Sequence, residues 1–296
     1  MKKEKSELIK NDFKKIIDKS KKVDDVQTYV KNGITNTMVI DGNIEINNSM
    51  LTGPGISVLE AVARGSLQFN MNWTDFFKFM KIFTEIQDSG LPCPNVLDIG
   101  GRWGEVNQIV YRNRFKINYT CVELNISIVK KVCSELFTTT DSRYVVMDAN
   151  KFIDIESVDN PGGYDFIILN DIVEHMDTKE KGMELILKSI KCLSSNGTMI
   201  ITTPNSYEPG RMQYPEDHVY EFSLDELKGI FNKGRLKISE IYGTNILMRH
   251  LKNVPEDKKH LLGTGMLSEI LGCKNAFIGL ALPEYARHLY ISLKKK

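Results

Sequence analysis

Three carboxylates stand at the ends of three successive apolar segments. Asp98 belongs to "NVLDIG", Glu123 to "NYTCVEL" and Asp148 to "RYVVMDA". If these segments are parallel strands, their carboxyl ends meet at one edge of a sheet, which is where ligands bind in such folds. A carboxylate that accepts from two hydroxyl groups at once suits a ribose. Glu123 therefore predicts a ligand that contains a nucleoside, and an adenosyl group fits.

A turn flanked by glycines follows the first of these segments, and residues 100–104 read "GGRWG". Glycine lets the backbone approach a ligand closely, and the helix that follows would direct its free N–H groups at that ligand. A tight turn without a ligand would explain the glycines equally well, so the carboxylates carry the argument. The fingerprint G-x-G-x-x-G of nicotinamide-binding proteins is not met, because Gly100, Gly101 and Gly104 fall at other offsets.

A second group of polar residues lies further along the chain. Asp171, Glu174 and His175 occur in "DIVEHM", whereas His218 and Glu221 occur in "EDHVYEF". The i, i+3, i+4 spacing of the first three predicts that they share one face of a helical turn. Such groups can accept the proton of a hydroxyl or, as a mixed set of oxygen and imidazole ligands, bind manganese or magnesium. A histidine that only packs and hydrogen-bonds is the plain alternative for His175.

The elements that position these residues follow an alternating pattern. From residue 95 onward, apolar strands alternate with amphipathic helices, which predicts an α/β fold with a parallel sheet and helices on both faces. Seven strands are expected, at residues 95–100, 118–124, 143–149, 164–170, 198–204, 236–243 and 287–295. A helix beginning at the Ser223 cap, with Glu226 three residues on, carries a capping-box signal.

The first ninety residues follow a different pattern. Residues 1–22 are lysine-rich with apolar residues at helical spacing, which predicts a basic amphipathic helix. The segment "TMVIDGNIEIN" alternates around Asp41-Gly42, which predicts a β-hairpin, and residues 58–86 read as helix. We therefore expect an N-terminal extension over residues 1–90 whose helices cover the site.

The remainder, residues 91–296, is expected to form the main domain, with a cap insertion at about 248–287. Phe277, Tyr285 and Arg287 of this insertion are candidates either for a lid over the acceptor or for the core of the cap.

Composition narrows the possible partners. The chain has 296 residues and a formal net charge of +1, which gives no global attraction to nucleic acid or to an anionic membrane. The five cysteines lack the close pairing of zinc sites, the start "MKKEKSELIK" lacks an apolar signal core, and no apolar run approaches a membrane span. We expect a cytoplasmic protein with a small-molecule partner and without nucleic acid or a membrane span. Composition leaves its oligomeric state open.

The motifs "VLDIGGRWGEV", "CVELN", "VVMDAN", "YDFIILNDIVEHM" and "GTMIITTPN" resemble, in order and spacing, those of class I S-adenosylmethionine-dependent methyltransferases. The resemblance covers roughly residues 94–250. It implies a Rossmann-like, seven-stranded mixed sheet of order 3-2-1-4-5-7-6, with the last strand inserted antiparallel beside the sixth. It also implies S-adenosylmethionine as the cofactor.

Carried over to this sequence, the resemblance implies that residues 100–104 wrap the methionine moiety and that Glu123 takes the ribose hydroxyls. Asp148 would meet the adenine amino group, with Ala149 beside the ring. The full expected cofactor set is Asp98, Gly100, Gly101, Arg102, Gly104, Glu123, Asp148, Ala149, Asn170 and Asp171. This sequence departs from the family at Arg102, where glycine is usual. We expect its amide rather than its guanidinium to serve the ligand, and we expect Trp103 to pack under the N-terminal helices rather than to stack on adenine.

The expected activity is methyl transfer to a small-molecule acceptor, at a hydroxyl of a sugar, lipid or metabolite. His175, His218 and Glu174 are the catalytic candidates, and no metal is assigned. One alternative is a metal-dependent RNA 3′-terminal 2′-O-methyltransferase, whose metal centre the two carboxylates and two histidines resemble. The chain lacks the basic composition and the arginine-aromatic run that would hold single-stranded RNA. A second alternative is a non-catalytic scaffold that binds an adenosyl ligand, and the polar groups near His175 and His218 argue against it.

Overall fold

The computed structural model describes residues 23–31, 34–41, 73–135, 141–206, 212–246, 254–259 and 276–296. The chain divides into two compact units. The first unit comprises residues 1–69, 83–167 and 191–194, and the second comprises residues 70–82, 168–190 and 195–296. We describe each unit by itself.

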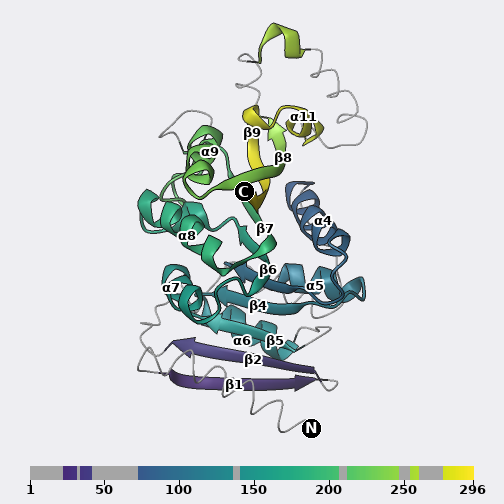
Figure 1. The fold of residues 1–296 in the computed structure, drawn as a ribbon, viewed down its shortest axis with the longest axis vertical. Helices are drawn as coiled ribbons and strands as arrows, with labels where there is room; N and C mark the ends of the chain where they lie inside the picture. Colours follow the sequence, from purple (N-terminus) through teal and green to yellow (C-terminus); the bar gives the residue numbers. More distant parts are fainter. Residues whose placement is uncertain are drawn as a thin grey trace. The chain divides into compact units, whose positions relative to one another are not determined.

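The first unit contains a largely parallel sheet, shown in purple to teal in Figure 1. Its strands are β1 (Val23–Lys31), β2 (Ile34–Asp41), β3 (Asn95–Ile99), β4 (Asn118–Glu123) and β5 (Ser142–Val146), together with residues 164–167 of β6 (Tyr164–Asn170). Their order is β1-β2-β5-β4-β3-β6. Only the β1–β2 pair of this unit is antiparallel among the pairings described. Helices α5 (Glu105–Arg112), α6 (Ile126–Glu135) and α7 (Ala149–Asp159) connect the strands that follow residue 94.

Continuous apolar runs explain why these segments form central strands. In β3, Val96, Leu97 and Ile99 are fully buried, and in β4 Cys121 and Val122 are equally inaccessible. A strand that is covered on both faces needs apolar residues at successive positions rather than at alternate ones. The carboxylates near the ends of these strands therefore stand out, because the residues beside them are largely apolar and buried.

The second unit contains an antiparallel arrangement. Residues 168–170 of β6 are followed in the sheet order by β7 (Leu193–Pro204), β9 (Ala286–Lys295) and β8 (Leu236–Ile246). Strand β9 runs antiparallel to both of its neighbours, β7 and β8. The helices of this unit are residues 73–82 of α4 (Trp73–Asp88), most of α8 (Lys179–Cys192), α9 (Leu224–Lys233) and α11 (Ala276–Ala281), with 3₁₀ turns η1 (Val173–His175) and η4 (Pro283–Tyr285).

The predicted fold is confirmed. All seven expected strands are present as β3 to β9, and their order corresponds to 3-2-1-4-5-7-6 with the last strand antiparallel. Strands β1 and β2 extend the sheet beyond β5, so nine strands are described where seven were expected. The capping box of α9 is also present, with the Ser223 hydroxyl accepting from the Glu226 N–H and the Glu226 carboxylate accepting from the Ser223 N–H.

The predicted β-hairpin around Asp41-Gly42 is wrong, because the strand that ends at Asp41 pairs with other strands than the expected second arm. Strand β2 ends at Asp41, and its antiparallel neighbour is β1, which precedes it. Its other edge pairs in parallel with β5 (Figure 1). Both edges of β2 are therefore occupied by strands other than the expected second arm. The predicted helix at residues 1–22, that second arm and residues 58–72 lie outside the described residues.

Helix α4 confirms the C-terminal part of the helix expected at residues 58–86. The division at residues 90 and 91, and the covering role of the N-terminal helices, stay predictions. Within the described part of the chain, no helix combines the length and apolarity that crossing a bilayer requires.

Candidate functional site

The glycine-flanked turn of the first unit adopts a conformation that its glycines make possible. Gly100 and Gly104 have φ values of 74° and 66°, in the left-handed region that glycine enters without strain. The Gly104 N–H donates to the Gly101 carbonyl at 2.7 Å, which closes the turn, and α5 begins directly afterwards. Gly101 is needed for space, since a Cβ there would lie 2.8 Å from the Asp98 carboxyl carbon and from the Cys121 sulfur.

Beneath this turn, Asp98 is buried without a cation beside it among the described contacts. Its side chain is 1% exposed, and its Oδ2 accepts from the Tyr119 hydroxyl at 2.6 Å. Its Oδ1 is buried and has no hydrogen-bond partner in the described structure. Burial raises the pKa of Asp98 to about 7, against the lowering effect of the Tyr119 hydroxyl. A buried carboxyl oxygen without a donor is an unusual feature that suits a ligand with N–H or O–H groups.

Glu123, at the end of β4, is held by backbone donors. Its Oε1 accepts from the Asn125 N–H at 2.9 Å, and its Oε2 accepts from the Arg102 N–H at 3.2 Å. Burial raises the pKa of this carboxyl, and the two backbone donors offset part of that effect. Each carboxylate oxygen has a second acceptor position. Glu123 can therefore hold the turn in place and still accept from ribose hydroxyls.

Arg102 lies in the left-handed region with a φ of 40°. This conformation costs a non-glycine residue about 1–2 kcal/mol, and here the hydrogen bond to Glu123 opposes that cost. The residue is exposed, and its described contact to the site is made by its amide. The expectation that the amide rather than the guanidinium of Arg102 serves the ligand stays a prediction. Trp103 is 7% exposed and therefore packed, and its position under the N-terminal helices stays a prediction.

Asp148 has a local role that the sequence analysis did not anticipate. It is the N-cap of α7, and its Oδ1 accepts from the Lys151 N–H at 2.9 Å. Ala149, the first residue of that helix, is buried. Asp148 is exposed and keeps one oxygen without a described partner, so capping does not exclude the expected contact with adenine. Its assignment to the cofactor stays a prediction.

In the second unit, Asn170 and Asp171 are fixed by β7. The Thr202 hydroxyl lies 2.8 Å from Asn170 Oδ1 and 2.8 Å from Asp171 Oδ1. Asp171 has a φ of 49°, and its N–H donates to the Thr202 carbonyl at 3.0 Å. Its Oδ2 forms an ion pair with Lys78 of α4. Burial opposes ionisation of Asp171, but the Lys78 ammonium outweighs it and lowers the pKa.

The expected single helical face for Asp171, Glu174 and His175 is not what the structure shows. Residues 173–175 form a 3₁₀ turn in which the His175 N–H donates to the Ile172 carbonyl at 3.0 Å, and Asp171 precedes it in a left-handed conformation. Glu174 is 1% exposed, whereas His175 is exposed. The tighter 3₁₀ turn and the left-handed backbone of Asp171 place these three side chains in different environments, although the i, i+3, i+4 spacing predicts one shared face.

Glu174 is the most deeply buried of these groups. Its Oε2 accepts from the Thr203 hydroxyl at 3.1 Å, whereas its Oε1 is buried without a described partner. Burial and the charge of Asp171 raise the pKa of Glu174 well above its usual range. Its backbone carbonyl accepts from the Val219 N–H at 2.9 Å, which ties the loop that carries His218 to this turn.

His218 is oriented by a buried carboxylate. Its Nδ1 lies 2.7 Å from Glu221 Oε1. Glu221 is itself 1% exposed and accepts from the backbone N–H groups of Gln213 and Tyr214. The Nδ1 atom of His175 lies 3.0 Å from the Asp217 carbonyl oxygen.

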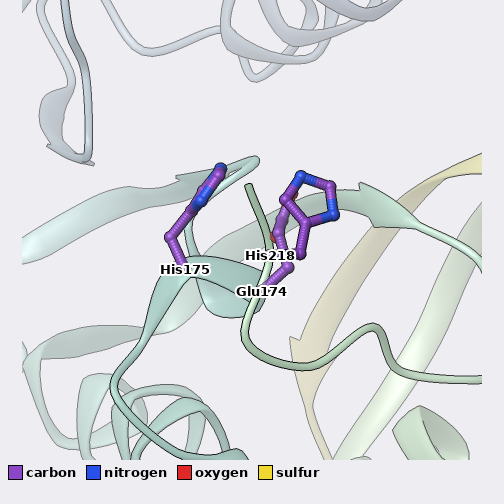
Figure 2. Close-up of side chains that lie close together, drawn as sticks. All are labelled: Glu174, His175 and His218. Carbon is purple, nitrogen blue, oxygen red and sulfur yellow. The ribbon is translucent and has the colours of Figure 1, made fainter. Parts of the chain in front are cut away.

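Figure 2 shows Glu174, His175 and His218, which we call the polar cluster, with the first two on η1 and the third on the loop that follows β7. The two imidazole rings meet edge to face with their centroids 4.7 Å apart. Each of the three side chains offers a ligand atom, and these atoms lie within 4.8 Å of one another. The structure thus brings together all three catalytic candidates expected from the sequence.

Two contributors were missed by the sequence analysis. Lys78 pairs with Asp171 across 93 positions in the chain, and Tyr119 holds Asp98 from the neighbouring strand. The only sequence signal for Lys78 is a lysine within the strongly apolar run "DFFKFMKIF". Tyr119 sits in a strand where it reads as one more buried aromatic residue, so its polar role had no signal.

Comparison with known proteins identifies the class. The profile of a family described as "Methyltransferase domain" matches residues 72–238, which is more than half of the chain. No curated protein matches the sequence. Among solved structures, the [4+2]-cyclase SpnF is similar with a TM-score of 0.51 and 13% identity, covering 83% of this chain and 93% of that chain. Magnesium protoporphyrin IX methyltransferase from Synechocystis PCC 6803, solved with S-adenosylhomocysteine, has a TM-score of 0.50 and 10% identity, covering 82% and 95%.

The chain therefore belongs to the methyltransferase domain family. It is an enzyme of the class I methyltransferases, which use S-adenosylmethionine. At 10% and 13% identity, the solved structures show the fold alone.

The described residues fit this cofactor. The turn at residues 100–104 has the open backbone that close approach requires, and a Cβ at Gly101 would collide with Asp98. The partnerless Oδ1 of Asp98 and the acceptor positions of Glu123 provide for an ammonium group and for hydroxyls. Which of these residues contact the cofactor remains a proposal.

Proposed function

We propose that the enzyme methylates a hydroxyl group of a small-molecule acceptor, such as a sugar, a lipid headgroup or another metabolite. The observation that carries this proposal is the polar cluster, because a hydroxyl must lose a proton during methylation, whereas an amine with a lone pair need not. Two oriented imidazoles and a carboxylate are suited to bind a hydroxyl and to favour loss of that proton.

The two units have separate roles in this proposal. In the first unit, Asp98, the turn at residues 100–104, Glu123, Asp148 and Ala149 hold S-adenosylmethionine. In the second unit, the polar cluster holds the acceptor. The cofactor supplies an electrophilic methyl group on a sulfonium. In the overall transfer an O–C bond forms, the C–S bond breaks to leave a neutral thioether, and the hydroxyl proton is released.

Glu123 gives the first test of the cofactor assignment. Calorimetric titration of the purified protein with S-adenosylhomocysteine should show binding, whereas titration with NAD should not. Glu123→Ala should weaken that binding roughly tenfold or more, because it removes the acceptor of the ribose hydroxyls, an effect of about 1 kcal/mol or more. Glu123→Gln should fall between the two, since the amide keeps one acceptor oxygen. Unchanged affinity in Glu123→Ala would overturn the ribose assignment.

Glu180→Ala is the matched control, because Glu180 is an exposed glutamate in the first turn of α8. Transfer of a labelled methyl group to a panel of hydroxyl compounds, with amines in parallel, then tests the acceptor class. Turnover on amines alone would overturn the hydroxyl assignment.

A further inference from the structure

The polar cluster has the features of a metal centre. Among the described residues it is the one group of three or more histidine, cysteine or acidic side chains whose ligand atoms converge, all within 4.8 Å of one another. One carboxylate and two imidazoles are a ligand set that divalent first-row metals accept, with positions left open for other ligands.

The partners of the two imidazoles fix which ring nitrogen carries a proton. The Asp217 carbonyl oxygen can only accept, so Nδ1 of His175 must be its donor at 3.0 Å. Glu221 holds Nδ1 of His218 at 2.7 Å in the same manner, and the backbone donors of Gln213 and Tyr214 fix that carboxylate in turn. In a neutral imidazole whose Nδ1 is the donor, Nε2 carries the lone pair. Metal-binding histidines are oriented in this way, by a carboxylate or a carbonyl on the other nitrogen.

Glu174 provides a second, independent observation. Its side chain is 1% exposed, and its Oε1 is buried without a hydrogen-bond partner in the described structure. The Thr203 hydroxyl occupies only Oε2. A buried carboxylate oxygen with no donor is costly, and a cation would remove that cost. Lys78 is engaged with Asp171, so the described structure assigns that ammonium to another carboxylate.

We propose that Glu174, His175 and His218 bind a divalent metal ion whose open positions receive the hydroxyl oxygen of the acceptor. The metal-binding part rests on the cluster alone, and the acceptor part rests on the proposed function. The sequence alone led us to assign no metal to these residues, because glutamate–histidine pairs also occur in methyltransferases without one. The fixed Nδ1 atoms and the partnerless Oε1 are the new observations. A bound divalent ion makes a hydroxyl more acidic, so its proton passes to solvent more readily and the metal keeps its oxidation state.

Metal binding can be measured without turnover. The full-length protein, treated with EDTA and desalted, is titrated with Mn²⁺ by calorimetry and electron paramagnetic resonance, and in parallel with Co²⁺, whose visible absorption reports nitrogen ligands. We expect one site per chain. Glu174→Gln should weaken binding at least tenfold, because it keeps the size of the side chain and an acceptor for Thr203 while removing the charge. His218→Ala should do the same. His288→Ala, which alters a histidine of the second unit outside the cluster, should leave the affinity unchanged.

The outcomes separate the two proposals. If neither ion binds, or if Glu174→Gln binds as tightly as the unaltered protein, the metal site is wrong. The rival explanation, a proton on Glu174 in place of a cation, then accounts for the partnerless oxygen. Binding of S-adenosylhomocysteine and methylation of a hydroxyl in the presence of EDTA would leave the proposed function standing without the metal. Metal binding without any hydroxyl acceptor would uphold the site and overturn the acceptor part.

Discussion

Asp98 and Glu123 of the first unit differ in their partners from several carboxylates of the second unit. Other carboxylates of the first unit, Asp41 and Glu156, pair with Lys151 and Arg143. In the first unit, Asp98 and Glu123 accept from neutral donors, which are the Tyr119 hydroxyl and the backbone N–H groups of Asn125 and Arg102. Burial raises the pKa of both. In the second unit, several carboxylates pair with lysines and have lowered pKa values. They include Asp171 with Lys78, Glu226 with Lys179 and Glu240 with Lys81.

This difference separates carboxylates that a ligand can still use from carboxylates that the protein has already neutralised. A group held by neutral donors keeps its capacity to interact with an ammonium or with hydroxyls, at a cost in stability. A group that pairs with a lysine contributes to stability and offers less to a ligand. Glu174 lies in the second unit but has a raised pKa and a partnerless oxygen, like Asp98 of the first. Among the described carboxylates, the partnerless oxygens of Asp98 and Glu174 therefore mark the two places where we propose ligands.

The largest effect that we predict follows from Asp98. Its pKa is raised from 3.8 to about 7, so the folded state retains a proton that the unfolded state has released between these values. Stability should therefore fall as pH rises from about 4 to about 7, by a few kcal/mol, since a tenfold change in the proton affinity of one group corresponds to about 1.4 kcal/mol. Asp98→Asn has no charge to bury and should lack this slope. Urea unfolding of both proteins without cofactor, at half-unit pH intervals, measures the difference.

The relevant quantity is the difference between the two pH profiles rather than either stability alone, because the asparagine amide also introduces a donor into a buried site. Parallel profiles for the two proteins between pH 4 and 7 would show that Asp98 is not a buried, uncompensated carboxylate. The proposed contrast between carboxylates held by neutral donors and carboxylates paired with lysines would then fail.

An intermediate effect is expected from added volume beside Asp98. Gly101→Ala would place a Cβ 2.8 Å from the Asp98 carboxyl and from the Cys121 sulfur, and overpacking of this kind costs about 1–3 kcal/mol. Gly90→Ala is the matched control, because Gly90 has a φ of 73° but nothing within 4 Å of the added atom, so it bears only the backbone cost of about 1 kcal/mol. Unfolding free energies of both variants give the comparison.

Cys121→Ala should restore part of the stability lost in Gly101→Ala, since it removes one of the three atoms that the added Cβ would meet. If the double variant is no more stable than Gly101→Ala, the close packing around Asp98 is not the cause of the loss.

The strands were predictable from the sequence because their signal is local. Segments such as "YDFIILN" and "TMIITTP" are apolar at successive positions, which is what a buried strand requires, and each appears where expected. The hairpin was placed wrongly because Asp41-Gly42 and Asn32-Gly33 are both strong turn dipeptides in alternating sequence, and nothing local decides between them. Strand β2 pairs with β5, which lies more than a hundred residues later in the chain, and no local sequence pattern predicts a pairing over that separation.

The residue types of the site were also predictable, whereas their interactions were not. Glu123 was identified because it ends an apolar segment, whereas His175 and His218 were identified from the polar runs "DIVEHM" and "EDHVYEF". The left-handed backbone at Arg102 and Asp171 depends on contacts with Glu123 and Thr202, which the sequence does not reveal. The orientation of each imidazole likewise depends on Asp217 and Glu221, whose roles follow from the path of one loop.

The smallest effect should come from the second unit and should have the opposite sign in pH. Partial burial disfavours ionisation of Glu226, but hydrogen bonds from Lys179, Tyr220 and Ser223 lower its pKa to about 2. The stability that this carboxylate contributes is therefore fully present above about 4.5 and is lost as pH falls toward 2. Glu226→Gln keeps the capping-box residue type but removes the charge, so it should lower stability at pH 7 by about 1 kcal/mol, a value reduced by the partial exposure of the pair.

Guanidinium unfolding at pH 7 and pH 3.5 tests this difference. The gap between Glu226→Gln and the unaltered protein should narrow at the lower pH, whereas Asp225→Asn, which alters an exposed carboxylate on the same helix, should change stability little at either pH. A gap that stays constant would mean that the loss comes from packing or capping rather than from charge. The lysine partner of Glu226 would then not make it differ from Asp98 in the way that we propose. The Lys78 ammonium would still explain the lowered pKa of Asp171, but that explanation would not extend to the other carboxylates of the second unit.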